Sequence, residues 1–165
     1  MFWLLSVSTA LAAPNNQNAK DAIKAALHNA AGKPVDIDLT DADRLKVVRL
    51  GLSGHGITNL ESLTNLPNLK VLWVHNNRLR NLSPVSKMKN MEALYLDHNQ
   101  IDDLTPLANC TKLRTLYLDN NRPKELLPLA NLKHLETLSL WHSRLLSIQG
   151  IEGLVKIRRL VLCAN

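Results

Sequence analysis

The sequence predicts an α/β solenoid, in which repeated coils stack side by side and line one concave wall with a parallel β-sheet. Three observations point to this fold. Apolar residues, above all leucine, recur with a period of 22 residues from Val47 onward. Asparagine recurs at one fixed position in four of the six units. A short amphipathic helical segment precedes the first unit, where a solenoid needs a cover for its first coil.

The repeat region is predicted to span residues 47–165, as five full units and a truncated sixth. The units begin at Val47, Leu69, Met91, Leu113, Leu135 and Ile157. Repeat positions 1, 4, 6, 11, 14, 17 and 20 are expected to be apolar, and 34 of these 35 places in the full units hold Leu, Ile, Val, Met or Cys. Positions 4 and 6 predict one short strand per unit, and the later positions return the chain along the opposite side.

The single exception is Pro123 at position 11, which removes a backbone donor and part of an apolar side chain from its coil. Leucine in its place is expected to stabilise the array by roughly 1 kcal/mol if the pocket is open, whereas destabilisation would mean that the coil has closed around the proline ring.

A recurrent asparagine marks the end of each predicted strand. Position 9 holds His55, Asn77, Asn99, Asn121, Ser143 and Asn165. An inward amide there can bond backbone groups of its own turn and of the next coil, which would be costly to bury without a partner. Ser143 and His55 are expected to do this only in part.

The first 13 residues are predicted to be a secretory signal peptide. They carry no charge, contain an apolar stretch from Phe2 to Ala13 and end in the small residues that a signal peptidase accepts. Two features depart from the usual pattern, namely Pro14 and the lack of a basic residue before the apolar stretch. We place the cleavage after Ala12, and the segment predicts a secreted, cell-surface or periplasmic protein.

Residues 14–46 are predicted to form a linker and a helical cap. The segment 21–31 has a helical apolar period, and one face of it carries Ala22, Ile23, Ala26, Leu27 and Ala30. Asn18 is expected to cap the start of this helix, and Gly32 to end it. Thr40 is placed to cap a second short turn. A one-sided helix of about three turns is not stable alone in water, so it is expected to lie on the first coil.

The repeats resemble those of a known family. The strand phrases MEALYLDHNQI and LRTLYLDNNRP, and the return segments DDLTPLANCTK and KELLPLANLKH, are similar to the 22-residue class of leucine-rich repeat proteins found in bacterial internalins. The resemblance implies short 3₁₀ segments on the convex side, where Pro84, Pro106 and Pro128 recur, and an internalin-type N-terminal helical cap. It also implies a recognition role, although the class includes intracellular scaffolds that regulate enzymes.

Positions 5 and 7 of each unit are expected to face outward on the concave wall. Beyond the predicted signal the chain has four aromatic residues, and all of them occupy these positions. Trp and Tyr are preferred anchors of interfaces, although aromatic residues also favour strands and stabilise their cross-strand neighbours. The candidate ligand-binding residues are therefore Trp73, His75, Tyr95, Asp97, Tyr117, Asp119 and Trp141.

Two carboxylates accompany the aromatic residues. Asp97 and Asp119 share position 7 on neighbouring strands, so we expect them about 5 Å apart. Like charges at this distance repel unless a cation joins them, and a partner's lysine or arginine would suit both the acids and the rings. The alternative is internal neutralisation by His75, or by Arg78 and Arg122.

The sequence offers little support for catalysis, metal binding or nucleic-acid binding. The glycine-rich segment 51–56 lacks the spacing of a phosphate loop or a nucleophile elbow, and the repeat accounts for it. His98 and His142 lie two units apart, about 10 Å, too far to share one metal ion. The net charge of +6 is spread over several repeat positions. We expect no enzyme activity, cofactor, metal, nucleic acid or membrane span.

The C-terminal end is expected to be exposed. Unit six supplies Ile157, Leu160 and Leu162 but no return segment or cap. A solenoid that stops there shows apolar side chains and a strand edge to water, which predicts either a fragment of a longer repeat protein or self-association through this end. Cys163 could then cross-link two copies, since Cys110 lies three units away, too far for an intrachain disulfide.

The predicted function is a non-enzymatic extracellular recognition module that binds a protein or peptide on its concave face. Two other functions stay open. The chain could be a structural spacer or N-terminal fragment of a larger repeat protein, or an intracellular scaffold that regulates an enzyme.

Overall fold

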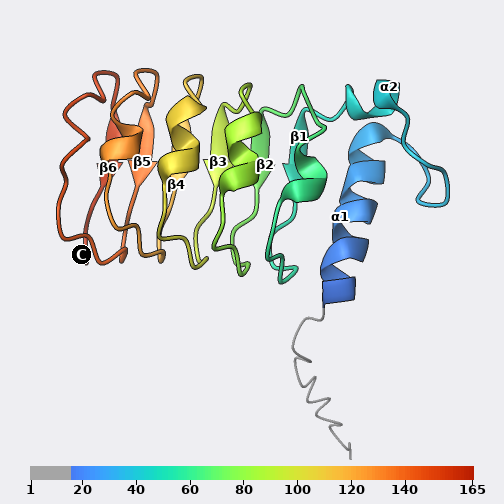
Figure 1. Cartoon of the computed structure of the whole chain (residues 1–165), viewed down its shortest axis with the longest axis horizontal. Coiled ribbons are helices and arrows are strands. Elements are labelled where there is room, and N and C mark those ends of the chain that lie inside the picture. Colours follow the sequence, from blue (N-terminus) through green and yellow to red (C-terminus); the bar gives the residue numbers. More distant parts are fainter. Residues whose placement is uncertain (1–15) are drawn as a thin grey trace, which may run out of the picture.

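The computed structural model describes residues 16–165 and shows a row of coils with one six-stranded parallel sheet (Figure 1). The predicted solenoid is confirmed, and the predicted signal peptide lies outside the described residues. The strands are β1 (Arg49–Gly51), β2 (Val71–Trp73), β3 (Ala93–Tyr95), β4 (Thr115–Tyr117), β5 (Thr137–Ser139) and β6 (Arg159–Val161). They follow one another in chain order, and each pairs with the next at identical repeat positions, so Leu72 faces Leu94 and Leu94 faces Leu116.

The core is a column of aliphatic side chains between the sheet and the return segments. At repeat position 4, for example, the side chains are all fully buried, namely Leu72, Leu94, Leu116 and Leu138. The return segments of the first four units contain short 3₁₀ helices on the side opposite the sheet (Figure 1). These are η1 (Glu61–Leu63), η2 (Ser83–Lys87), η3 (Thr105–Asn109) and η4 (Leu127–Leu129).

The recurrent prolines lie where the resemblance implied. Pro84, Pro106 and Pro128 each occupy the first turn of a 3₁₀ helix, where the fixed φ of proline fits and its missing N–H leaves no bond unmade.

Unit five departs from the predicted pattern. Its return segment contains no 3₁₀ helix, and Ile148, expected in the core at position 14, is 53% exposed. The chain turns instead at Gly150, whose φ of +105° suits glycine and whose Cα packs on the backbone of Leu126 and Leu127. A Cβ at this glycine would lie 2.6 Å from the Leu127 Cα, so the close approach depends on glycine.

The asparagine ladder is confirmed, with one correction to its direction. The Asn99 Nδ2 donates to the Leu96 carbonyl of its own turn at 2.8 Å and to the Val74 carbonyl of the preceding coil at 3.0 Å. Its Oδ1 accepts from the Leu79 N–H, also in the preceding coil, at 2.9 Å. The predicted partner was the next coil. This was wrong because the amide lies beneath the turn that the chain has already completed.

Of the two substitutes in the ladder, Ser143 behaves as expected, whereas His55 does not take the predicted part. Ser143 is buried, and its hydroxyl donates to the Leu118 carbonyl of the preceding coil at 3.2 Å but replaces only the donor half of an amide. His55 is exposed, and no side-chain hydrogen bond joins it to the ladder within residues 16–165.

The N-terminal helix α1 (Asn16–Ala31) covers the first coil and contacts β1 (Figure 1). The predicted apolar face is confirmed, with Ile23 and Leu27 buried and the alanines of that face half-buried. The helix already includes Asn16, the first described residue, so Asn18 lies inside it and is not its N-cap as predicted. Gly32 ends the helix at a φ of +69°, the left-handed conformation that glycine adopts most easily.

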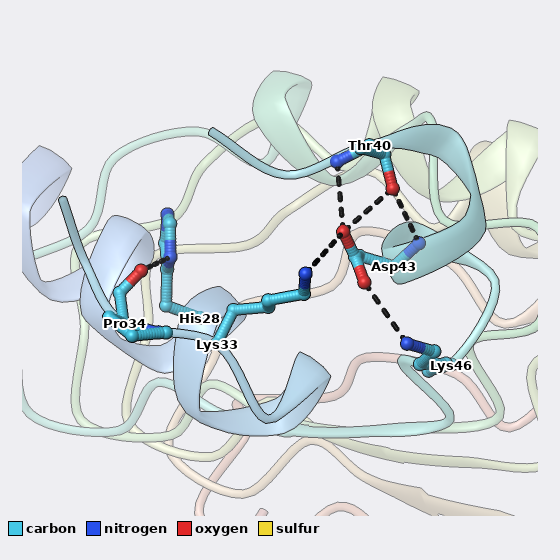
Figure 2. A network of polar contacts seen from close by, with 6 residues as sticks. All are labelled: His28, Lys33, Pro34, Thr40, Asp43 and Lys46. Carbon is cyan, nitrogen blue, oxygen red and sulfur yellow. Dashed lines mark hydrogen bonds and ion pairs between the residues drawn. The ribbon is translucent and has the colours of Figure 1, made fainter. Parts of the chain in front are cut away.

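A polar network fixes the loop between α1 and the short helix α2 (Asp41–Arg44), as Figure 2 shows. Thr40 caps α2 as predicted. Its hydroxyl accepts from the Asp43 N–H, and the buried Asp43 carboxylate accepts in return from the Thr40 N–H at 3.2 Å and hydroxyl at 2.7 Å. Lys46 donates to the same carboxylate at 3.1 Å, and Lys33 of the loop lies 3.8 Å away.

These contacts set the charge of the cap. Hydrogen bonds from Thr40 and Lys46 hold the pKa of Asp43 well below its usual range. Nearby, His28 is buried against the same loop, with its Nδ1 2.6 Å from the Pro34 carbonyl oxygen (Figure 2). The loop is therefore tied to both helices by groups with defined partners.

Candidate ligand-binding site on the concave wall

A hollow of about 450 Å³ lies on the concave wall and brings together all seven candidate residues. It is lined by Trp73, His75, Tyr95, Asp97, His98, Tyr117, Asp119, Asn120 and Trp141. These residues come from equivalent positions in four neighbouring coils, because the 22-residue register repeats the same outward direction at each strand.

The aromatic rings form an ordered stack. The Trp73 and Tyr95 ring centroids are 5.6 Å apart with an interplanar angle of 16°, and those of Tyr95 and Tyr117 are 5.3 Å apart at 17°. Each stacked pair contributes about 0.5–1.5 kcal/mol beyond its burial, so the rings also support the sheet. Because the faces meet one another, it is mainly the ring edges that are left for a ligand.

The two ends of this stack differ. At the first end, the Arg49 guanidinium carbon lies 5.3 Å from the Trp73 ring centroid, a cation–π arrangement. At the other end, β5 carries the small, buried Ser139 at the position that holds Tyr117 in β4. Within residues 16–165, no ring or cation stacks on the outer face of Tyr117.

Each of the two carboxylates accepts hydrogen bonds from other residues through one of its oxygens. Asp97 Oδ1 accepts from the Asp119 N–H at 3.1 Å. Asp119 Oδ1 accepts from the Ser139 hydroxyl at 2.6 Å and from the Trp141 N–H at 2.7 Å. In the described part of the chain, the Oδ2 oxygens of both acids accept no hydrogen bond from another residue. Each therefore keeps acceptor capacity for a ligand.

The described chain does not neutralise these acids by ion pairs. No lysine, arginine or histidine nitrogen of residues 16–165 lies within 4.0 Å of the Asp97 or Asp119 carboxylate. His75 instead places its Nδ1 3.0 Å from the Ser53 hydroxyl. Burial raises the pKa of Asp97 and the charge of Asp119 adds to this effect, whereas the hydrogen bond from the Asp119 N–H and the nearby His75 oppose it. The two adjacent carboxylates of the site therefore repel each other when both are ionised.

Four residues of the site were not predicted from the sequence. His98 and Asn120 line the hollow from position 8, where both adopt a left-handed φ of 54°. The recurrence of Asn and His at this position is the signal that could have found them, because short polar side chains tolerate this conformation best. Arg49 and Ser139 matter for what they do at the two ends of the stack, and only the three-dimensional contacts reveal this.

Catalysis, metal binding and a membrane span were also considered for the described residues. Ser53 and His75 are adjacent, but no carboxylate hydrogen-bonds the histidine ring in the described chain. Residues 16–165 contain no group of three His, Cys, Asp or Glu side chains placed to hold a metal ion. Neither helix of this region has the length and apolar character that crossing a bilayer requires.

A second hollow, of about 520 Å³, lies between α1 and the first coil. Its floor includes Ile23, Leu27 and Leu39, with Lys24 and Arg44 among its polar residues. None of the candidate residues lines it.

Comparison with known proteins identifies the family. Residues 45–87 and 89–131, together more than half of the chain, match a family described as leucine-rich repeats in two copies. No match was found among curated protein sequences.

Two solved structures are similar to this chain. An internalin (inlF) from Listeria monocytogenes strain 4b F2365 is 26% identical with a TM-score of 0.81, over 93% of this chain and 46% of that one. An internalin C2 (inlC2) from the same strain is 22% identical with a TM-score of 0.44, over 87% of this chain and 86% of that one. The chain spans about half the length of the first. It belongs to the leucine-rich repeat family, and its solenoid and N-terminal helix are internalin-like.

Proposed function

We propose that this chain is a non-enzymatic recognition module that binds a protein or peptide in the concave hollow. Its leucine-rich repeat, internalin-like fold is that of a protein-interaction module. The observation that supports binding in the concave hollow is the composition of this hollow. All four aromatic residues of the described chain line it, together with two carboxylates that have no ion-pair partner. Trp and Tyr are among the residues that most often anchor the centre of an interface.

A purely structural role accounts for only part of these residues. Stacking explains Trp73, Tyr95 and Tyr117, since each pair stabilises adjacent coils. It does not explain Trp141, which is 44% exposed, or two like charges placed side by side. A spacer would be stabilised by removing this repulsion, so the arrangement favours binding.

We also propose an extracellular location, with residues 1–13 as a signal peptide, 14–46 as linker and cap, and 47–165 as the solenoid. The uncharged apolar start of the sequence supports this proposal. Sequencing the N-terminus of the mature protein tests it. A mature chain that begins near Pro14 would support secretion, whereas a chain that retains Met1 would favour the intracellular scaffold.

The binding proposal is tested by selecting ligands from a displayed library of random peptides on the purified chain. Selected peptides are expected to bind Trp73→Ala at least about 30-fold more weakly, the effect of removing an interface anchor. Leu127→Ala is the matched control, because Leu127 is an exposed apolar residue, 47% exposed, in η4 on the opposite side. Peptides whose affinity falls with the Leu127 variant but not with the Trp73 variant would place the binding surface elsewhere.

A further inference from the structure

The hollow of about 520 Å³ between α1 and the first coil takes no part in the proposed function. Its apolar floor is formed by Ile23 and Leu27 of α1, which are both buried, and by the half-buried Leu39 of the loop that follows. A hollow of this size is in the range of sites that bind small molecules. It shares no lining residue with the concave hollow, so the two can be studied separately.

Side chains that carry nitrogen follow one line of α1 along this hollow. Lys20, Lys24 and His28 all line it and are spaced four residues apart, so the helix places them on one face. Arg44 of α2 is a further cation of the lining. Within residues 16–165, no carboxylate lies within 4.0 Å of the charged nitrogens of these two lysines or this arginine. Asp38 is the one acid among the lining residues, so the charge balance favours an anion.

His28 adds a polar atom that has no partner. The residue is only 3% exposed, and its Nδ1 lies 2.6 Å from the Pro34 carbonyl oxygen. Because a carbonyl can only accept, Nδ1 carries the proton of this bond. The other ring nitrogen, Nε2, points away from the bond in Figure 2, and no residue of the described chain hydrogen-bonds it.

This second nitrogen is open to the hollow. Among the described residues, every side-chain nitrogen that is sealed from solvent has a hydrogen-bond partner. The Nε2 of His28 has none, so it must border open space, and the space that this residue lines is the hollow beside α1. A buried ring is therefore held by one nitrogen and presents the other to whatever enters.

We propose that this hollow binds a small organic anion with an apolar body, of the type of a medium-chain carboxylic acid. The carboxylate lies between Lys24 and His28, where Nε2 hydrogen-bonds one of its oxygens. The proton of that bond is taken up from solution or arrives with the acid, because the neutral ring carries its proton on Nδ1. The aliphatic chain lies on Ile23 and Leu27. From Lys20 to His28 the helix rises about 12 Å, which accommodates an extended chain of medium length.

The test titrates the protein with octanoate and follows the methyl signals of Ile23 and Leu27 by NMR. Octanol and octylamine are the matched probe controls, because they share the chain but are uncharged and cationic at neutral pH. We expect octanoate to shift both signals saturably, octanol to bind at least about tenfold more weakly and octylamine to leave the signals in place. The indole signals of Trp73 and Trp141 report on the concave hollow and are expected to stay unchanged.

The double variant Lys20→Gln/Lys24→Gln tests the role of the lysine charges. Both side chains are exposed and form no ion pair in the described chain, so the fold is retained. The variant is expected to bind octanoate at least about tenfold more weakly, because two charged partners of the carboxylate are lost. The matched protein control is Lys87→Gln/Lys89→Gln, which changes the net charge equally at two exposed lysines of the second coil and should keep the parent affinity.

His28→Asn tests the role of the ring nitrogen. Asparagine places an N–H near the position of Nδ1 and can keep the bond to the Pro34 carbonyl, but it has no group at the position of Nε2. We expect octanoate to bind about fivefold more weakly or worse. The melting temperature is measured alongside, and if asparagine loosens the loop, the lysine variants decide the question.

Four results would overturn the anion site: no saturable shift with octanoate, equal affinity for octanol, equal affinity in the two lysine double variants, or shifts of the two indole signals at the same octanoate concentrations. The proposed function stands or falls separately. Its test is the loss of library-selected peptides on Trp73→Ala, a residue that does not line this hollow.

Discussion

At the scale of single residues, Pro123 and Ser143 interrupt the same ladder contact from its two sides. In the other coils, an amide oxygen at position 9 accepts from the N–H at position 11 of the preceding coil, as Asn121 does from Ile101 at 3.0 Å. Proline has no N–H to donate at position 11 of unit four. Serine supplies no amide oxygen at position 9 of unit five. The donor and the acceptor are therefore missing together.

This pairing reverses the stability change expected for Pro123→Leu from the sequence. The site is buried, so leucine would introduce an N–H without the amide oxygen that accepts it in the other coils. We predict that Pro123→Leu destabilises the protein by about 1–3 kcal/mol, the cost of a buried unpaired donor. Adding Ser143→Asn should recover most of this loss. Urea unfolding of both single variants and the double variant measures the coupling, and a more stable Pro123→Leu single variant would contradict the explanation.

Asp97 illustrates a residue whose charge costs stability. Its pKa is raised in the folded state, chiefly by burial, so ionised Asp97 opposes folding once the pH exceeds its unfolded value. We predict that Asp97→Asn melts at the same or a higher temperature than the parent at neutral pH, because asparagine can still accept from the Asp119 N–H. Thermal unfolding followed by circular dichroism checks this. A clearly lower melting temperature at neutral pH would show that the charge is stabilising.

The sequence predicted the candidate residues of this wall because the 22-residue register alone fixes which side chains face outward. It did not predict the uses of Arg49 and Ser139, since the cation–π contact and the Ser139–Asp119 hydrogen bond depend on rotamers. The period therefore predicts which side chains face outward, whereas the contacts between side chains on the same face are seen only in the structure.

At the scale of elements, the cap is predicted to be sensitive to acid through Asp43. Its pKa is held low in the folded state by Thr40 and Lys46, with Lys33 adding to this. The contribution to stability is therefore complete above the ordinary aspartate value of about 3.9 and is lost as the pH falls from there through the folded value.

We predict that Asp43→Asn lowers the melting temperature at neutral pH and flattens its decline in acid. Asp36→Asn, which alters an exposed acid of the same loop, is the control and should leave both unchanged. Melting curves recorded from neutral pH into acid make the comparison. Parallel curves for the parent and Asp43→Asn would contradict a role for this carboxylate.

The elements that the sequence mispredicted lie at the two ends of the array. Helix α1 includes Asn16 to Asn18, which the apolar period did not reach because these residues are polar. Unit five keeps the leucine spacing yet exposes Ile148, because its path is set by the close approach of Gly150 to the backbone of unit four. The period is therefore least informative for the cap helix, which is not part of a repeat, and for the return segment of unit five, whose path depends on the contact of Gly150 with unit four.

At the scale of the whole molecule, the most exposed of the large apolar side chains in the described residues lie in the C-terminal coils, although the cap region also exposes several. Leu146 is 99% exposed, Val155 76%, Ile148 53% and Leu160 41%. Burying such side chains against a second copy would recover part of about 1.5–3 kcal/mol for each. Cys163 is exposed beside them, whereas the thiol of Cys110 is buried, which raises its pKa to about 11.

We therefore predict that the 165-residue chain self-associates as its concentration rises, and that Leu160→Glu shifts it toward the monomer. Leu127→Glu, at an exposed leucine in η4, is the control and should not do so. Sedimentation equilibrium under reducing conditions separates this contact from a Cys163 cross-link. A monomer at every concentration would contradict the prediction.

The most direct test of the central claim compares the binding and the stability of one variant, Tyr117→Ala. The ring stacks on one neighbour, so its removal should lower stability by at least about 0.5–1.5 kcal/mol, the contribution of the stack beyond burial. If the concave hollow is the binding site, affinity for a library-selected peptide should fall by about 2 kcal/mol or more, measured by titration calorimetry. An unchanged affinity in a variant that unfolds at lower urea concentration would show that the aromatic stack only supports the sheet, and would contradict the claim.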